Sequence, residues 1–365
     1  MKKMGICILL ASLLLSGCSL FSGSYVHTVP HNMESSSPHS DNMTAGSYQE
    51  LRRNIQSLVT SGADSGVIYL TDYDSSAIER NLSTAVRFVL NSDPVGAYAA
   101  ESISYEIGTN AAVPAVALTV TYRHTASEIA GITYVADMAG ASECIHTALD
   151  EAASHAVLRV EAYEDTDFEQ LVQEYARYSP QTVMETPKVT TEIYGTGKSR
   201  VVSLSFSYEN SRDALQHMQE QVQPVFSSAG LYVSGEDSDR RKIEMLYGFL
   251  MDRFDYTVET SITPAYSLLR HGVGDSRAFA SVYAAFCRQA GIECMMVTGT
   301  CQGEPWTWNI VCDSGVYYHV DLLHCCANGI FREMKDSDMS GYVWDYSSYP
   351  ECGAAAASAA ENSGS

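Results

Sequence analysis

The chain has 365 residues, enough for two or three domains, and 45% of them are hydrophobic, as in an ordinary globular protein. Against 22 Lys and Arg residues it carries 44 Asp and Glu residues, which gives a formal net charge of −22. Nucleic acid phosphates would repel such a chain, so we expect no nucleic acid partner.

The first 18 residues have the pattern of an export signal. Lys2 and Lys3 precede an apolar stretch at 6–15 that is too short to favour a membrane-spanning helix. The following Leu-Ser-Gly-Cys, ending at Cys18, resembles a bacterial lipobox, which implies that Cys18 is acylated and becomes the new N-terminus. An ordinary signal peptide with an incidental Cys18 is the alternative. We expect a protein outside the cytoplasm, bound to the membrane only through this lipid anchor.

Residues 19–47 and 353–365 are poor in large apolar groups. The first stretch is rich in Ser, Gly, Pro and Asn, and predicts a flexible linker. The second is an Ala-, Ser- and Gly-rich tail.

Between them, residues 48–235 contain a weak repeat that predicts two small α/β modules, 48–131 and 132–235. Each copy reads strand, helix, strand, strand, and helices at 48–59 and 212–226 border the pair. In the first copy the strands are 66–70, 102–107 and 116–122 with a helix at 78–90; in the second they are 156–162, 188–194 and 201–208 with a helix at 167–178. Neither copy holds a cluster of His, Cys and acidic residues, so we expect a spacer or a platform for binding a partner.

The third unit, 236–352, carries the motifs. After an apolar helical stripe that begins at Ile243 come Gly-Asp-Ser-Arg-Ala-Phe-Ala at 274–280, Trp-Thr-Trp-Asn at 306–309 and Tyr-Tyr-His-Val-Asp at 317–321. In order and spacing these resemble the transglutaminase-like family of the papain-type fold, whose pattern reads roughly G-V-C-x-G-Y-A, then H-A-W-N, then W-Y-H-V-D. The resemblance implies an α+β protein: a papain-like, transglutaminase-type C-terminal domain preceded by the two modules.

The resemblance also assigns the catalytic positions. The family's Cys falls on Ser276, its His on Trp306 and its Asp on Asp321. In such a site a thiol at a helix N-terminus is activated by an imidazole that the carboxylate orients. A serine hydroxyl needs an adjacent base, and indole donates one hydrogen bond but accepts no proton. We therefore expect Ser276 to cap or face solvent and Asp321 to accept hydrogen bonds from the backbone or from a tryptophan.

Other residues could replace the missing base or nucleophile. His271 precedes Ser276 by five residues, His319 shares a strand face with Asp321, and Cys301 precedes the Trp306 strand. Trp308 and Asn309 match the family's own motif and are further candidates for the cleft. Trp306 either fills the vacated cleft, which we favour, or offers a stacking surface to a sugar or peptide.

Seven of the cysteines lie between Cys287 and Cys352, and outside the cytoplasm this density suggests disulfides. The segments around Cys301 and Cys312 could pair as strands, which makes these two the first candidate pair; Cys325 or Cys326 with Cys352 is the second. Metal ligation is the rival interpretation, but there is no C-x-x-C pair, and adjacent cysteines are poor ligands of one tetrahedral zinc. We expect no metal and no cofactor.

Two functions remain open. The first is a surface lipoprotein whose transglutaminase-like domain is inactive and binds a protein or a peptidoglycan ligand. The second is an active enzyme of the transglutaminase or cysteine-protease type that acts on peptide or amide bonds through a non-standard nucleophile or base.

Overall fold

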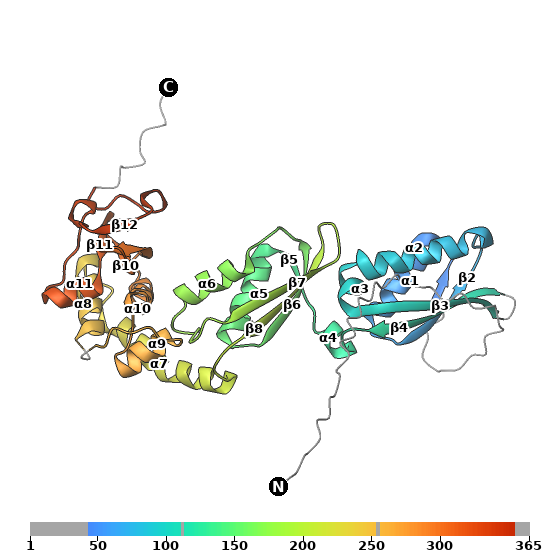
Figure 1. Ribbon diagram of the computed structural model, residues 1–365, viewed down its shortest axis with the longest axis horizontal. Coiled ribbons are helices and arrows are strands. Elements are labelled where there is room, and N and C mark those ends of the chain that lie inside the picture. The colour runs from blue at the N-terminus through green and yellow to red at the C-terminus, as the bar shows by residue number, and fades with distance from the viewer. Residues whose placement is uncertain (1–42, 111–112, 253–255, 355–365) are drawn as a thin grey trace, which may run out of the picture.

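The computed structural model describes residues 43–110, 113–252 and 256–354. It mixes helices and strands and contains three four-stranded sheets, which lie in a row along the molecule (Figure 1). The export signal with Cys18, most of the linker 19–47 and most of the tail 353–365 lie outside the described residues. Within them no helix is both long enough and apolar enough to cross a membrane.

Module 1 is a sheet in the order β1-β2-β4-β3, with β1 parallel to β2 and the other pairs antiparallel. Apolar residues of two helices, such as Leu51 and Leu82, pack on one face of the sheet against Ile68 and Leu118. The elements in chain order are β1 (Met43–Ala45), α1 (Tyr48–Thr60), β2 (Ser65–Leu70), α2 (Ile78–Asn91), α3 (Pro94–Ala99), β3 (Ala100–Asn110) and β4 (Val113–Tyr122).

Module 2 repeats this arrangement with the order β5-β6-β8-β7 and the same pattern of parallel and antiparallel pairs. The repeating unit is therefore larger than the sequence predicted, because a first strand and a first helix precede each predicted copy. After the connecting helix α4 (Ala126–Ala130), its elements are β5 (Thr133–Asp137), α5 (Met138–Asp150), β6 (His155–Ala162), α6 (Phe168–Tyr178), β7 (Lys188–Tyr194) and β8 (Arg200–Ser207).

The C-terminal domain packs helices against one face of an antiparallel sheet in the order β11-β10-β9-β12. Helix α7, expected to border module 2, instead contributes Leu215, Val222 and Phe226 to this domain's core. The elements are α7 (Arg212–Tyr232), α8 (Asp239–Met251), α9 (Pro264–His271), α10 (Ser276–Gln289), β9 (Cys294–Cys301), β10 (Glu304–Asp313), β11 (Val316–Val320), α11 (Leu322–Asn328) and β12 (Tyr342–Trp344).

Modules 1 and 2 meet through side chains near the β7–β8 turn. Val201 of module 2 is fully buried in the core of module 1, and the Tyr194 ring meets the Tyr98 ring edge-on at 5.4 Å. Gly195 in the turn has φ +88°, and a side chain there would collide with Pro94. Burial of apolar groups across this contact fixes the two modules against each other.

Module 2 joins the C-terminal domain through the end of α6. The Arg177 guanidinium donates to Thr298 Oγ1 at 2.6 Å, and Ser281 Oγ donates to the Arg177 carbonyl at 2.6 Å. Ser281 lies on α10, so the last turn of α6 is capped by the central helix of the neighbouring domain. Such contacts satisfy carbonyls that a helix end leaves unpaired.

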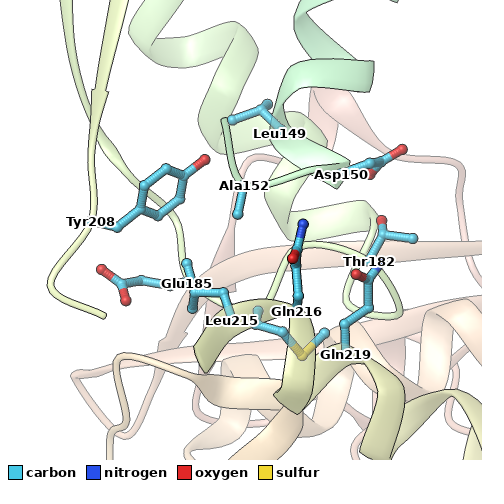
Figure 2. Close-up of a pocket in the computed structure, with 10 residues that line it drawn as sticks. Leu149, Asp150, Ala152, Thr182, Glu185, Tyr208, Leu215, Gln216 and Gln219 are labelled. Carbon is cyan, nitrogen blue, oxygen red and sulfur yellow. The ribbon is translucent and has the colours of Figure 1, made fainter. Parts of the chain in front are cut away.

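A second contact surrounds the buried Glu185, which precedes β7. Its carboxylate accepts hydrogen bonds from the backbone of Glu209 at 2.5 Å and Asn210 at 3.1 Å, and so fixes the segment that leads into α7. Figure 2 shows Glu185, Tyr208 and Gln216 of α7 among the residues that line a cavity of about 10 Å³. This volume holds no more than one water, so the cavity is a packing gap and not a ligand site.

Candidate functional site

Helix α10 places Ser276 at its first position, as the sequence predicts. The Asp275 carboxylate caps the helix by accepting from the backbone N–H of Ala278 at 2.9 Å. Residues Ala278 to Cys287 are all buried, so the helix runs through the middle of the domain. Ser276 Oγ accepts a hydrogen bond from the backbone N–H of Thr307 at 3.2 Å, which brings it against the peptide that follows Trp306.

Trp306 occupies the position of the expected base and is bound to the expected carboxylate. Its indole N–H donates to Asp321 Oδ2 at 2.7 Å, and the ring packs on the apolar cluster around Trp308. The Tyr342 hydroxyl donates to the same oxygen at 2.7 Å, while Oδ1 accepts the backbone N–H of His324 at 3.0 Å. Asp321 is 2% exposed. Three donors thus satisfy this buried carboxylate without an imidazole.

Sequence reasoning missed Tyr342. Ser276, Trp306 and Asp321 were found through the spacing of the family's motifs, whereas Tyr342 lies 21 residues beyond Asp321 on the three-residue strand β12. It pairs with Cys301 of β9. Burial and the Asp321 charge raise the pKa of Tyr342 far above its ordinary value, so the phenol stays protonated and serves as a donor only.

The strand β12 can approach because residue 299 has no side chain. Gly299 lies opposite both Trp306 and Trp344 in the sheet, and an added Cβ would come within 2.2 Å of the Val343 carbonyl oxygen. The same Cβ would meet the Trp308 ring at 3.0 Å. Glycine at this position therefore allows the strand that carries Tyr342 to pair beside the site.

His319 belongs to a separate, buried hydrogen-bonded chain. Its Nδ1 accepts from the Trp308 indole N–H at 2.9 Å, and its Nε2 lies 2.8 Å from Asp336 Oδ1. Because indole is a donor only, the hydrogen of the neutral ring must sit on Nε2 and be donated to Asp336. Both nitrogens are occupied and the ring is 0% exposed, so His319 cannot act as the base of Ser276.

Cys352 lies near the same pair, and the ligand atoms of His319, Asp336 and Cys352 all lie within 4.8 Å of one another. These are residue types that bind zinc. A metal on Nε2 would move the ring hydrogen to Nδ1, where it would face the indole N–H. Burial beside Asp336 also raises the pKa of the Cys352 thiol to about 12, which opposes the thiolate that a metal needs. The arrangement therefore fits a hydrogen-bonded cluster better than a metal site.

Acid should weaken this cluster. Burial lowers the pKa of His319 below its ordinary 6.5, with Asp336 opposing the shift. A lowered folded-state pKa means that the unfolded state binds the proton first, so the stabilisation is complete above about pH 6.5 and is lost as pH falls further. The slope for one proton is at most about 1.4 kcal/mol per pH unit. The free energy of unfolding, measured by denaturant between pH 7.5 and 5, should fall less steeply in His319→Gln. Equal slopes in the two proteins would contradict the assignment.

The other candidate replacements for the base lie apart from Ser276 or lack the chemistry. His271 is exposed at the end of α9 and meets the edge of the Tyr266 ring at 5.3 Å, and no hydrogen bond among the described residues joins it to Ser276. Cys301 lies opposite Tyr342 in the β9–β12 pair, but no hydrogen bond among the described residues joins its thiol to an imidazole that could activate it.

Trp308 and Asn309 lie in the core and not on an open cleft, since both are 0% exposed. The Asn309 amide donates to the Ala280 carbonyl at 2.9 Å and so holds β10 against α10. Trp308 packs edge-on against Tyr342 and Trp344, with ring centroids 5.2 and 5.7 Å apart. These residues position the site without facing it.

The expected bridge between Cys301 and Cys312 is wrong. Cys301 pairs with Glu304 at one end of the β9–β10 hairpin, whereas Cys312 lies eight residues further along β10, beyond the pair formed by Val311 and Cys294. Eight strand residues span about 26 Å, far beyond the reach of a disulfide. All eight described cysteines are free, including Cys325, Cys326 and Cys352 of the second candidate pair. Cys287 is a buried core thiol.

Comparison with known proteins identifies the C-terminal domain. Residues 228–346 match the sequence model of the transglutaminase-like superfamily. No curated protein matches the chain. Solved structures that resemble it include one described as "Crystal structure of a TGase", with 10% identity, a TM-score of 0.25, and coverage of 46% of this chain and 50% of that one.

Two further structures are similar in part. A "Putative Cysteine Protease from Cytophaga hutchinsonii" has 11% identity and a TM-score of 0.25, covering 43% of this chain and 70% of its own. A "putative protease" from Parabacteroides distasonis has 7% identity and a TM-score of 0.23, covering 57% and 45%. The chain thus spans about half the length of the TGase structure, and TM-scores this low add no support by themselves.

Residues 228–346 form a transglutaminase-like domain, which confirms the assignment made from the motifs.

Proposed function

We propose that this protein is a non-catalytic transglutaminase-like protein that binds a protein or peptidoglycan ligand. The observation that carries the proposal is the 2.7 Å hydrogen bond from the Trp306 indole to Asp321. It fills the place in which an imidazole would have to sit between the nucleophile and the carboxylate. No hydrogen bond among the described residues joins Ser276 to a basic nitrogen, so its hydroxyl has nothing to remove its proton.

The modules support a binding role. Module 2 is fixed to the C-terminal domain through Arg177, Ser281 and Glu185, and module 1 is fixed to module 2 through Val201 and Tyr194, so the two modules extend the domain by two sheets. A domain that only cleaves an amide bond does not need this extension. A protein that binds a ligand along several units does need it.

The test is an activity assay with amine-donor and peptide substrates. We expect no turnover by the wild-type protein and an identical signal for Ser276→Ala. Ser276→Cys with Trp306→His should raise turnover by at least about tenfold over background, while each single change stays at background, because a thiolate and its base act as a unit. Wild-type turnover that disappears in Ser276→Ala would establish the alternative, an active enzyme with a serine nucleophile.

We also propose that the protein is lipid-anchored outside the cytoplasm, on the basis of the lipobox that ends at Cys18. Cys18→Ala should remain an unprocessed precursor and should incorporate no fatty-acid probe, whereas wild-type protein should incorporate it and sediment with membranes. Replacement of the nearby Ser16 by alanine is the control and should leave labelling intact. A Cys18→Ala protein that still incorporates the probe would show that the lipobox interpretation is wrong.

A further inference from the structure

A groove of about 380 Å³ lies where module 2 meets the C-terminal domain. Gln181 of module 2 forms one wall, α7 contributes Gln223 and Ser227, and the last turn of α10 contributes Arg288 and Gln289. A groove of this volume is in the range of small-ligand sites. It lies at the opposite end of α10 from Ser276, about 18 Å away along the helix axis. The groove is therefore separate from the transglutaminase-like site.

Most of the residues that line the groove have side chains that can form hydrogen bonds. It holds three side-chain amides, each of which offers a donor and an acceptor. Gln223 Nε2 donates to the Gln181 backbone carbonyl at 2.8 Å, which joins the wall from module 2 to α7.

The one charged lining residue is a cation, in a chain whose net charge is −22. Arg288 Nε donates to the Ala284 carbonyl at 3.3 Å and Nη2 to the Tyr178 carbonyl, which fixes the guanidinium in place. Its Nη1 makes no hydrogen bond to the described residues and remains free for a carboxylate or carbonyl oxygen.

These features select the class of ligand. Sugars are held by stacking on an open aromatic face, but the one aromatic ring of the lining, Phe226, is 4% exposed and offers none. A peptide supplies N–H groups for the glutamine acceptors, carbonyls for their donors and a terminal carboxylate for Arg288. We propose that the groove binds the end of a peptide that carries a free carboxylate, across the junction of module 2 and the C-terminal domain.

Calorimetric titration of the full chain in detergent micelles tests this. The probes are N-acetylated alanine tripeptides: one all-L with a free carboxylate, its C-terminal amide, and one ending in D-Ala-D-Ala. We expect the free acids to bind and the amide to bind at least about tenfold more weakly, since a hydrogen bond between charged groups is lost. Tighter binding of the all-L acid would indicate that the ligand is a protein C-terminus, and tighter binding of the D-Ala-D-Ala acid would indicate a cell-wall stem peptide.

Two neighbouring serines of α7 give a matched pair of variants. Ser227 lines the groove and Ser228 does not, and both side chains are exposed, so neither change disturbs the core. Ser227→Trp should fill the groove and abolish binding, whereas Ser228→Trp should bind as wild type. Arg288→Gln should remove the preference for the acid over the amide. No binding of any probe, equal binding of acid and amide by wild type, or equal effects of the two tryptophans would overturn the proposal.

Discussion

Replacing Trp308 by alanine will lower the free energy of unfolding of the C-terminal domain by about 3–5 kcal/mol. Trp308 is 0% exposed and fills the space between β10 and β12, against Tyr342 and Trp344. Its removal opens a cavity and also takes the donor away from Nδ1 of His319. Denaturant unfolding followed by tryptophan fluorescence measures the effect selectively, because all three tryptophans of the chain lie in this domain.

Val343→Ala is the control for this measurement. Val343 lies on β12 between two buried neighbours of Trp308, but its own side chain is 63% exposed. We expect a change within about 0.5 kcal/mol, as for other surface positions. A Trp308→Ala protein as stable as Val343→Ala would show that the face of the sheet with Trp308 is not a packed core.

Asp321→Ala should lower the free energy of unfolding by about 3 kcal/mol. The change leaves the Trp306 indole, the Tyr342 hydroxyl and the His324 backbone N–H without their acceptor. In an active transglutaminase-like enzyme the same change would act mainly on turnover. Here the carboxylate has only structural partners, so its effect should appear in stability. Unfolding in denaturant at pH 7.5 measures this change in the free energy of unfolding.

A double variant separates the hydrogen bond from mere loss of volume. Trp306→Phe removes the indole N–H and keeps an aromatic ring, so Asp321→Ala in the Trp306→Phe background leaves one donor fewer unpaired. The two changes should then cost less together than the sum of the single costs. Additive costs would mean that the contact between Trp306 and Asp321 contributes nothing to stability.

Much of the candidate site could be predicted from the sequence because it depends on local order. Asp275 and Ser276 begin a helix by ordinary capping, and the apolar spacing that follows buries one side of it. The motifs at 306–309 and 317–321 then place Trp306 on β10 and Asp321 directly after β11, where it caps α11. The prediction that Asp321 accepts from a tryptophan and from the backbone is confirmed, with Trp306 and His324 as the donors.

Predictions failed where chain segments meet across longer distances. The sequence predicted that the segments around Cys301 and Cys312 pair as strands, but not that the two cysteines lie at opposite ends of the resulting hairpin. Helix α7 has the pattern of a module helix, and only packing decides that its apolar face joins the C-terminal core. The first strand of each module was missed because β1 and β5 have three and five residues, too few to show a period. The helix at 48–59 was predicted and is α1, whereas its counterpart α5 in module 2 was missed.

By itself the sequence determined the class of the C-terminal domain, the helix that carries Ser276 and the absence of an imidazole at Trp306, since each depends on residue type and spacing along the chain. The tertiary structure alone decided that Tyr342 completes the set of donors to Asp321, that the Trp308 indole fixes the tautomer of His319, and that Gln181, Ser227 and Arg288 share one groove. The physical reason is that hydrogen bonds and cavities depend on distances in space. Those distances are set by how helices and sheets pack, which the local pattern of residues does not encode.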